Sequence, residues 1–481
     1  LTAALCRIAT RRGLSVAPFK PQNMSNNAAA CPDGGEIGRA QALQARAAGL
    51  SPSTDMNPVL LKPQTDRTAQ VVVQGKALDA MAAADYMGSR DQLMGAVLES
   101  FERLVDQHDL VLVEGAGSPA EVNLRARDIA NMGFARAARV PVCLIGDIDK
   151  GGVIASLVGT QTVLSREDAE LIKGFLINKF RGDPRLFDNG VRAIEDETGW
   201  PCFGVIPWLK ATALLPAEDA VTLERAMPRQ PGALKIAAPM LSRIANFDDA
   251  DPLRLEPGVS FEWIKPGRPI PRDADLIILF GTKSTIGDLA FLREQGWDHD
   301  IVAHARAGGR VLGICGGYQM LGYAIDDPDG YDGDPACVRG LGLLNVETVM
   351  TREKTVTPAQ GKCAVSGLDI DGYEIHVGDT TGGDTERPFA ILRDQPEGAR
   401  SPDSRIQGTY LHGAFAADAF RAHWLKSMGG MAESGMNYQS DVEAALDALA
   451  DGVEEAVEIE ALIDLAAGPA MIIRTPCSRP R

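Results

Sequence analysis

The chain has 481 residues, of which 45% are hydrophobic and 23% charged, and it carries a formal net charge of −17. This length is more than one hydrophobic core usually fills, so we expect two or three domains. The acidic balance argues against nucleic acid as a partner, because phosphate binding needs a basic surface. No apolar run reaches the roughly 20 residues that a membrane span requires.

Eight cysteines are present, and none falls at the Cys-x-x-Cys or Cys/His spacing of a zinc site. Nothing in the sequence resembles a secretory leader. We therefore expect free thiols and a cytoplasmic protein. Small molecules are the expected partners, and a homo-oligomer is left open.

Short β-rich segments alternate with helical patterns over the first 205 residues or so. In chain order they read SVAPF, LVLVEGAG, VPVCLIGDID, GFLINKF and CFGVIPW. Each segment is almost continuously apolar, as expected of parallel strands buried on both faces, with helices as the crossovers. This pattern predicts a doubly wound α/β domain, whose ligands would collect at the carboxyl ends of the strands.

A polar stretch with two prolines, LERAMPRQPGALK at residues 223–235, leads to a second series of strands. These read KIAAPM, DLIILFGT, RVLGICGG and RIQGTYLHG, and after about Met428 the pattern becomes helical and acidic. We expect a first domain over residues 1–225, a second over 234–428 and a helical tail over 429–481.

Cys315 lies in the segment GGRVLGICGGYQMLG, directly after a predicted buried strand and just before a helix. The glycines beside it allow the tight turn of a nucleophile elbow, and a helix N-terminus favours a thiolate. The backbone N–H of Gly316 can stabilise an oxyanion. We expect a second donor in the loop GTKST, which begins at Gly281.

A thiol nucleophile needs a base, and His412 in GTYLHGAF follows another predicted strand. The alternative is that Cys315 is one more buried cysteine and His412 a loop histidine. A lone cysteine would favour that alternative. The elbow glycines together with a strand-end histidine favour a catalytic pair instead.

The motifs GICGGYQMLG and GTYLHG resemble those of class I glutamine amidotransferases, whose domain has a flavodoxin-like α/β fold. That family usually carries an acid two residues after the catalytic histidine, where this chain has Ala414. What orients His412 is therefore left open. Glu374 and His376 in GYEIHVG are nearby candidates for a supporting contact, with a purely structural strand as an equal alternative.

Nearly the whole chain resembles the glutamine-hydrolysing cobyric acid synthases. The segments that carry the resemblance are VAPFKPQNMSNN, DGGEIGRAQALQA, MNPVLLKP, LVEGAGSPAEVNL, GDIDKGGVIASL, INKFRGD, IANFDDADPLR and the two amidotransferase motifs. The resemblance implies a first domain of the P-loop-NTPase type, similar to dethiobiotin synthetase, that uses ATP and Mg²⁺.

Several residues at predicted strand ends suit that chemistry. Glu114 and Asp147 offer hard oxygen ligands for Mg²⁺, and the resemblance implies the metal role for Glu114. Lys20 can approach phosphate, and Asn178 with Lys179 resembles the base-reading position of related folds. A set of amide groups and one arginine is expected to face the substrate, although a hydrogen-bonded loop or a packing role would look the same: Gln22, Asn23, Asn26, Asn27, Arg39 and Asn123.

The resemblance implies that ATP activates a carboxylate as an acyl phosphate, which ammonia released from glutamine then attacks. The implied substrate is adenosylcobyrinic acid a,c-diamide, amidated on its b, d, e and g carboxylates to adenosylcobyric acid, so the corrinoid is a substrate and not a cofactor. One alternative is a cobyrinic acid a,c-diamide synthase. Another is a nucleotide-switch protein of the partitioning-ATPase type, which would leave Cys315 and His412 idle.

The opening segment LTAALCRIATRRGLSVAPFK predicts a helix followed by a strand. Domains of the implied type begin with a strand and a glycine-rich phosphate loop, and the pattern GxxxxGK[ST] occurs nowhere in the sequence. We therefore expect the polypeptide as given to bind ATP weakly. A chain with glutaminase activity alone is a further alternative.

Overall fold

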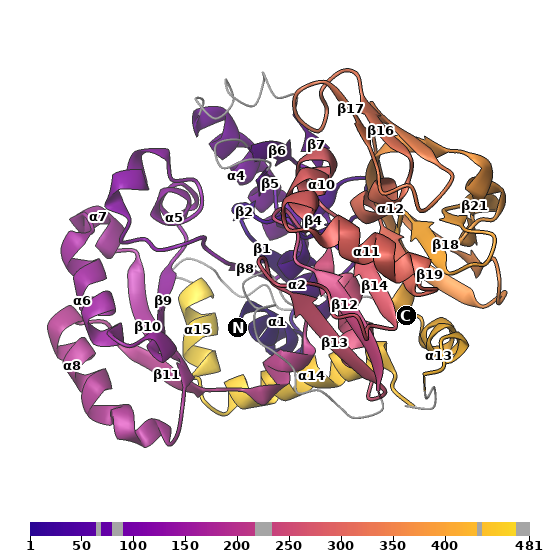
Figure 1. Cartoon of the computed structure of the whole chain (residues 1–481). Coiled ribbons are helices and arrows are strands. Elements are labelled where there is room, and N and C mark those ends of the chain that lie inside the picture. The colour runs from indigo at the N-terminus through magenta and orange to yellow at the C-terminus, as the bar shows by residue number, and fades with distance from the viewer. Residues whose placement is uncertain (64–68, 79–89, 217–232, 431–434, 468–481) are drawn as a thin grey trace, which may run out of the picture.

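The computed structural model describes residues 1–63, 69–78, 90–216, 233–430 and 435–467. These residues form two lobes, one built from the first half of the chain and one from the residues after the polar stretch (Figure 1). Most of the linker predicted at residues 223–235 lies outside the described residues, as does Cys477. None of the helices in the described ranges is long and apolar enough to cross a membrane.

The five strands predicted in the first half are present and parallel, but they form two sheets. β1 (Val16–Phe19) pairs with β8 (Leu110–Val113). β9 (Val142–Asp147), β10 (Ile172–Phe180) and β11 (Cys202–Pro207) make the second sheet, in the order β11-β10-β9. Because all these strands are parallel within their sheets, their carboxyl ends gather the polar residues that the sequence singled out.

Helices surround these strands, and a small sheet extends the first lobe toward the second. The helices are α1 (Thr2–Arg11), α2 (Arg39–Ala47), α4 (Arg90–Gln107), α5 (Met132–Ala138), α6 (Val153–Val163), α7 (Arg166–Ala169) and α8 (Asp188–Thr198). The small sheet has the order β2-β5-β6-β7, beside the hairpin β3-β4. The strands of the small sheet are β2 (Gln22–Met24), β5 (Val59–Pro63), β6 (Ala69–Val73) and β7 (Lys76–Ala77). The strands of the hairpin are β3 (Ala28–Ala30) and β4 (Glu36–Gly38).

The second lobe contains a sheet with the order β13-β12-β14-β15-β23-β22, parallel except for β22. Its central strand β14 is buried along its whole length, which explains its continuous apolar sequence LIIL. The strands are β12 (Leu234–Pro239), β13 (Val259–Ile264), β14 (Leu276–Leu279), β15 (Arg310–Ile314), β22 (Ala399–Arg400) and β23 (Ile406–Thr409). The helices are α9 (Asp251–Arg254), α10 (Thr285–Glu294), α11 (Trp297–Arg306), α12 (Gly316–Leu321) and α13 (Asp418–Ser427).

A second sheet of this lobe is built on a long antiparallel hairpin of β18 and β19. The sheet runs in the order β17-β16-β18-β19-β24, and the β20-β21 pair joins β18. Its strands are β16 (Ala324–Asp327), β17 (Ala336–Arg339), β18 (Glu347–Cys363), β19 (Asp369–Thr381), β20 (Ala390–Leu392), β21 (Gln395–Glu397) and β24 (Leu411–His412). The hairpin brings β19 beside β24 and also beside β3 of the first lobe.

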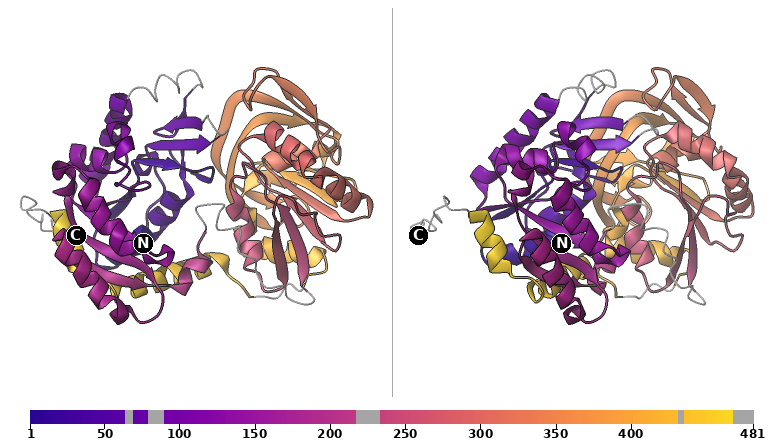
Figure 2. Two further views of the ribbon diagram at one scale, coloured as in Figure 1. Left: turned by 60° about the vertical axis from the view of Figure 1, so that its left-hand side comes forward. Right: turned by 90° about the vertical axis from the view of Figure 1, so that its left-hand side faces the viewer.

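The C-terminal helices α14 (Tyr438–Glu454) and α15 (Ile459–Ala467) return to the first lobe (Figure 2). The side chains that α14 buries recur at helical spacing and pack against α1: Val442, Leu446, Leu449 and Val453. Charged residues border this contact, with the ion pairs Arg7–Glu443, Arg11–Asp451 and Arg12–Glu454. The predicted helical tail is thus packed along the first helix of the chain.

Apolar side chains from both lobes meet in one buried cluster. Ala28, Leu60 and Val72 of the first lobe pack with Tyr373 and Ile375 of β19. Burial of this kind stabilises by about 25 cal/mol for each Å² of apolar surface removed from water. The two lobes are therefore held together by packing as well as by polar contacts.

A buried charge cluster lies beside that apolar contact. Glu36, which is only 1% exposed, accepts hydrogen bonds from Lys62 of its own lobe and from Lys354 of β18. Burial alone would raise the pKa of Glu36, but the charges of Lys354 and Lys62 outweigh it and hold the pKa far below its usual range. Nearby, Lys283 donates to Gln70 across the lobes at 2.7 Å, and burial lowers the pKa of Lys283 to about 7.

Candidate active site

Cys315 lies at the sharp turn between β15 and α12, as the sequence predicts. Its φ angle is +55°, a conformation that non-glycine residues rarely adopt. The glycines around it are needed for space, because a Cβ at Gly317 would lie 2.0 Å from the carbonyl oxygen of Leu279 and one at Gly313 would lie 2.5 Å from that of Gly317. A strained residue between a strand and a helix is the geometry of a nucleophile elbow.

His412 lies on β24 with only 1% of its surface exposed. Its Nδ1 atom is 2.6 Å from a carboxylate oxygen of Asp249, whose other oxygen accepts a hydrogen bond from the N–H of Gly413, also at 2.6 Å. Asp249 belongs to the short turn Phe247–Ala250 that follows β12. The carboxylate thus fixes both the imidazole and the backbone that carries it.

Asp249 is the acid that sequence reasoning missed. The two candidates that the sequence offered make other contacts: Glu374 pairs with Arg393, and the ring of His376 stacks on Tyr410 at 3.8 Å. The supporting contact to His412 comes instead from a residue 163 positions earlier in the chain. The available signal was a pair of adjacent acids within the otherwise unassigned segment IANFDDADPLR.

The surroundings of His412 favour its protonated form. Burial opposes the charge, but the charge and hydrogen bond of Asp249, together with the contact to the Cys315 thiol, raise the pKa of His412 to about 10. The ring of Tyr373 stacks on the imidazole with centroids 5.2 Å apart. Near neutral pH the site can therefore hold an imidazolium beside Cys315.

The two glycines predicted to supply oxyanion donors flank the nucleophile. A Cβ at Gly281 would lie 3.6 Å from Cβ of Cys315 and 3.4 Å from Cε1 of His412. A Cβ at Gly316 would lie 2.7 Å from the side chain of Thr282. The loop after β14 and the start of α12 are therefore in contact beside the nucleophile.

We expect Gly281→Ala to lower kcat for glutamine hydrolysis roughly tenfold, because a Cβ there would lie 3.1 Å from the carbonyl oxygen of Ala245, so that the loop beside Cys315 and His412 must shift. Release of glutamate measures the effect. Gly159→Ala is the matched control, since a Cβ there, in α6, has no neighbour within 4 Å. Equal kcat values for the two variants would contradict this reading of the loop.

At the carboxyl ends of β1 and β8, Lys20 and Glu114, two of the predicted site residues, are hydrogen-bonded to each other, and Gln44 also contacts Glu114. Lys20, just after β1, donates from Nζ to one oxygen of Glu114 at 2.7 Å, and Gln44 of α2 donates to the other at 2.6 Å. Burial would raise the pKa of Glu114, but the charge and hydrogen bond of Lys20 outweigh it and lower the pKa. Glu114 is thus held as a carboxylate beside a cation.

The ends of β9 and β10 form a second polar group. Asp147 lies opposite Asn178 in the register of these strands and pairs with Nζ of Lys179 at 2.7 Å. Next to them Arg181 donates to Asp149 at 2.6 Å. Over the part of the chain that the structure describes, no three histidine, cysteine or acidic side chains converge as metal ligands do.

The residues predicted to face the substrate do not form one group: some make hydrogen bonds within the protein, and one is exposed on the surface. Asn23 donates to Gln41 at 2.9 Å, and Asn27 accepts from the backbone N–H of Asn246 in the second lobe at 2.7 Å. Arg39 also contacts the second lobe, whereas Asn123 is exposed on the surface. Gln22 is half-buried, and the buried Oδ1 atom of Asn26 has no protein partner among the described residues.

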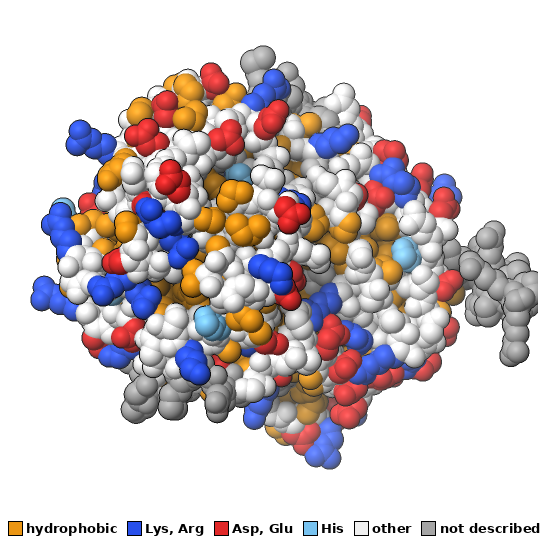
Figure 3. All heavy atoms as spheres, turned by 90° about the vertical axis from the view of Figure 1, so that its right-hand side faces the viewer, with side chains coloured by type: hydrophobic (Ala, Val, Ile, Leu, Met, Phe, Trp, Pro, Cys, Tyr) orange, Lys and Arg blue, Asp and Glu red, His pale blue; other side chains and the backbone are white. Residues whose placement is uncertain are grey.

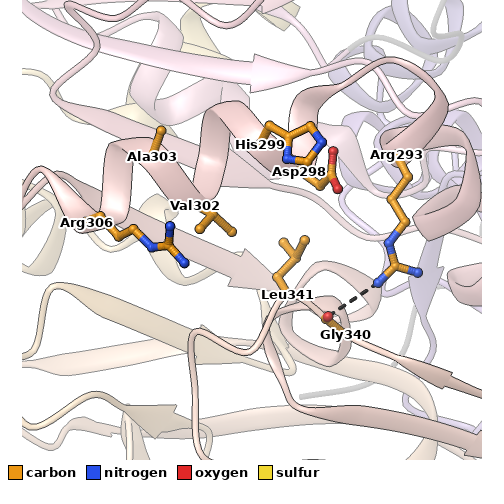
Figure 4. Close-up of a pocket in the computed structure, with 8 residues that line it drawn as sticks. All are labelled: Arg293, Asp298, His299, Val302, Ala303, Arg306, Gly340 and Leu341. Atoms are coloured by element: carbon orange, nitrogen blue, oxygen red, sulfur yellow. Dashed lines mark hydrogen bonds between the residues drawn. The ribbon is translucent and has the colours of Figure 1, made fainter.

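The outer face of the second lobe mixes acidic, basic and apolar side chains (Figure 3). A cavity of about 250 Å³ lies between α11 and the loop that carries Gly340 and Leu341, and its lining includes Arg293, His299 and Arg306 (Figure 4). None of its lining residues is among those that the sequence assigned to catalysis or binding. The cysteine–histidine site lies elsewhere in this lobe.

Both halves of the chain match known protein families. Residues 1–223 match the family model of the CobQ/CobB/MinD/ParA nucleotide binding domain, and residues 235–420 match that of the CobB/CobQ-like glutamine amidotransferase domain. A cobyric acid synthase of Hyphomonas neptunium is 64% identical, over 98% of this chain and 95% of that protein. The chain belongs to the cobyric acid synthase family.

Other members agree with this assignment. The cobyric acid synthase of Paracoccus denitrificans is 63% identical, and that of Brucella suis is 58% identical, each over 97% of this chain and 96% of the relative. The predicted α/β fold class of both halves is confirmed. As a member of the cobyric acid synthase family, the chain is a glutamine-dependent amidotransferase with a nucleotide-binding domain.

Proposed function

We propose that this chain uses ATP and glutamine to amidate the b, d, e and g carboxylates of adenosylcobyrinic acid a,c-diamide, which gives adenosylcobyric acid in cobalamin biosynthesis. The observation that carries the proposal is the 64% identity to a cobyric acid synthase along 98% of the chain. The buried His412–Asp249 pair, with Cys315 beside it, supports the glutaminase part.

In the glutaminase reaction, the thiolate of Cys315 attacks the amide carbon of glutamine. His412 gives its proton to the departing ammonia, and water then hydrolyses the glutamyl thioester with the imidazole as base. Asp249 holds the imidazole in one tautomer and stabilises its charge. The N–H groups of Gly316 and Gly281 are the proposed donors to the oxyanion.

In the ligase reaction, ATP converts a carboxylate of the corrinoid into an acyl phosphate, and ammonia displaces the phosphate. Lys20, Asn178 and Lys179 are the proposed ATP contacts. Glu114 and Asp147 are the proposed holders of Mg²⁺, and the lowered pKa of Glu114 fits this, because Mg²⁺ takes one or two ionised carboxylates besides phosphate oxygens. The ion would neutralise phosphate charge.

The corrinoid would contact the amide side chains near β2. Gln22 and Asn26 are proposed to bind it directly, with Asn123 at its edge, and the unpartnered buried Oδ1 atom of Asn26 supports this. Asn23 and Asn27 make hydrogen bonds within the protein and would shape the site. The cytoplasm is the proposed location, since it supplies ATP and glutamine and keeps thiols reduced.

The test is the number of amide nitrogens that the product gains. The chain is incubated with adenosylcobyrinic acid a,c-diamide, ATP, Mg²⁺ and glutamine labelled with ¹⁵N in the amide, and the corrinoid is analysed by mass spectrometry. We expect four labelled amides when ATP is supplied at a concentration that offsets the weak ATP binding expected from a sequence without the GxxxxGK[ST] pattern. No labelling of this substrate, together with two labelled amides when cobyrinic acid replaces it, would assign the chain to the a,c-diamide synthases. ATP hydrolysis without glutamine hydrolysis would favour a nucleotide switch.

A further inference from the structure

Arg39 belongs to the first lobe, yet its side chain lies at the glutaminase site of the second. It is the first residue of α2, and its guanidinium forms an ion pair with Asp248. The same guanidinium donates to the hydroxyl of Tyr373 at 3.3 Å and lies 5.3 Å from the centre of that ring. Arg39 therefore bridges two separate elements of the amidotransferase domain.

Of the two groups that Arg39 contacts, Tyr373 touches the catalytic histidine and Asp248 is the chain neighbour of the acid that does. Asp248 immediately precedes Asp249, and the two share the short turn Phe247–Ala250. Tyr373 stacks on the imidazole of His412, with the ring planes 15° apart. A displacement of either group would reach His412 through a single contact.

Arg39 supplies the positive charge that balances the buried carboxylate of Asp248. Asp248 and Asp249 are adjacent and buried, at 5% and 3% exposure, so that two carboxylates lie in one desolvated turn. Burial raises the pKa of Asp248; the charge of Arg39 opposes this and that of Asp249 adds to it. Without the guanidinium, the turn that carries Asp249 would hold an uncompensated buried charge or would rearrange.

We propose that Arg39 is a positioning residue for glutamine hydrolysis: it acts from the first lobe, through Asp248 and Tyr373, to hold Asp249 and His412 in line with Cys315. It does not touch the glutamine itself. The assignment rests on the proposed glutaminase reaction, and it gives Arg39 a different task from the substrate contact that the sequence suggested. The glutaminase site of the second lobe is thus completed by a side chain of the first.

The test compares Arg39→Gln with Arg39→Lys. We expect Arg39→Gln to lower kcat for glutamine hydrolysis roughly 10- to 100-fold, with KM for glutamine unchanged, because the alignment of catalytic groups is lost and not a substrate contact. Arg39→Lys should recover part of kcat, since lysine restores the charge beside Asp248 but cannot also reach Tyr373 with a planar fork. An irreversible glutamine analogue counts the competent sites, so that kcat refers only to folded protein.

Arg46→Gln is the matched control. Arg46 lies on the same helix and makes an ion pair of its own, with Glu443 of α14 at 2.6 Å, away from the glutaminase site. Its kcat per competent site should equal that of the unmodified chain. Equal kcat values for Arg39→Gln and Arg46→Gln would overturn the proposal, as would a rise in KM at constant kcat. An unmodified chain that hydrolyses no glutamine would instead contradict the proposed function itself.

Discussion

Replacement of Asp249 by asparagine is expected to lower kcat for glutamine hydrolysis about 10³- to 10⁴-fold without unfolding the chain. The amide can still meet Nδ1 of His412, but it neither stabilises the imidazolium nor fixes the tautomer that the carboxylate selects. Glutamate release from Cys315→Ala gives the reference for complete loss. The expected residual rate lies between that variant and the unmodified chain.

Glu374→Gln is the informative control for this prediction, because Glu374 was the acid that the sequence offered as a candidate to support His412. Its carboxylate pairs with Arg393, so the substitution should leave glutamine hydrolysis unchanged. The opposite pattern, in which Glu374→Gln loses activity and Asp249→Asn keeps it, would show that the geometry around Asp249 has been misread.

The same Asp249→Asn substitution should change the pH dependence of stability. The folded-state pKa of His412, about 10, is above its ordinary value of 6.5, so protonation of His412 stabilises the fold fully below about pH 6.5 and this contribution is lost as the pH rises through 10. Asparagine removes the charge that raises the pKa. Urea unfolding between pH 6 and 10 should therefore show a smaller loss of stability in the variant than in the unmodified chain.

Glu36→Gln is expected to cost about 3–5 kcal/mol of unfolding free energy, the usual consequence of removing one partner from a buried ionic group. Lys62 and Lys354, which approach Glu36 from the two lobes, would remain buried without their carboxylate. The midpoint and slope of the first urea transition measure the loss, since lobe separation would precede full unfolding.

The control for Glu36→Gln is Asp369→Asn. Asp369 pairs with Lys362 at 2.7 Å, but its side chain is 86% exposed, so the pair should contribute well under about 1 kcal/mol. If both substitutions had equally small effects, the charge cluster between the lobes would have no special role in holding them together.

The sequence was sufficient for features that depend on neighbouring residues. Cys315 was predicted because the elbow needs glycines at its own turn, and the strands of both halves were predicted because burial on two faces demands continuous apolar runs. Asp249 could not be predicted in this way. Its contact with His412 is created by the topology, which brings the turn after β12 beside β24.

Strand pairing and contacts between the lobes could not be predicted for the same reason, because they depend on residues that are far apart in the sequence. Apolar runs predict that β1, β8 and β9 are strands, but not that β8 pairs with β1 and β9 with β10 in separate sheets. Arg39 was expected to face the substrate because it belongs to the segment DGGEIGRAQALQA, which carries the family resemblance, with a packing role as the alternative. Only the arrangement of the two lobes shows that its guanidinium meets Asp248.

The packing of α14 along α1 has a consequence for biosynthesis of the chain. Arg7 and its partner Glu443 are 436 residues apart, so at a translation rate of about 5–20 residues per second the partner is made roughly 20–90 s after α1. Throughout that time the apolar face of α1 that packs against α14 in the folded protein lacks this contact. The first lobe can therefore be completed only after α14 has been synthesised, and chaperone binding to its nascent form should end when α14 leaves the ribosome.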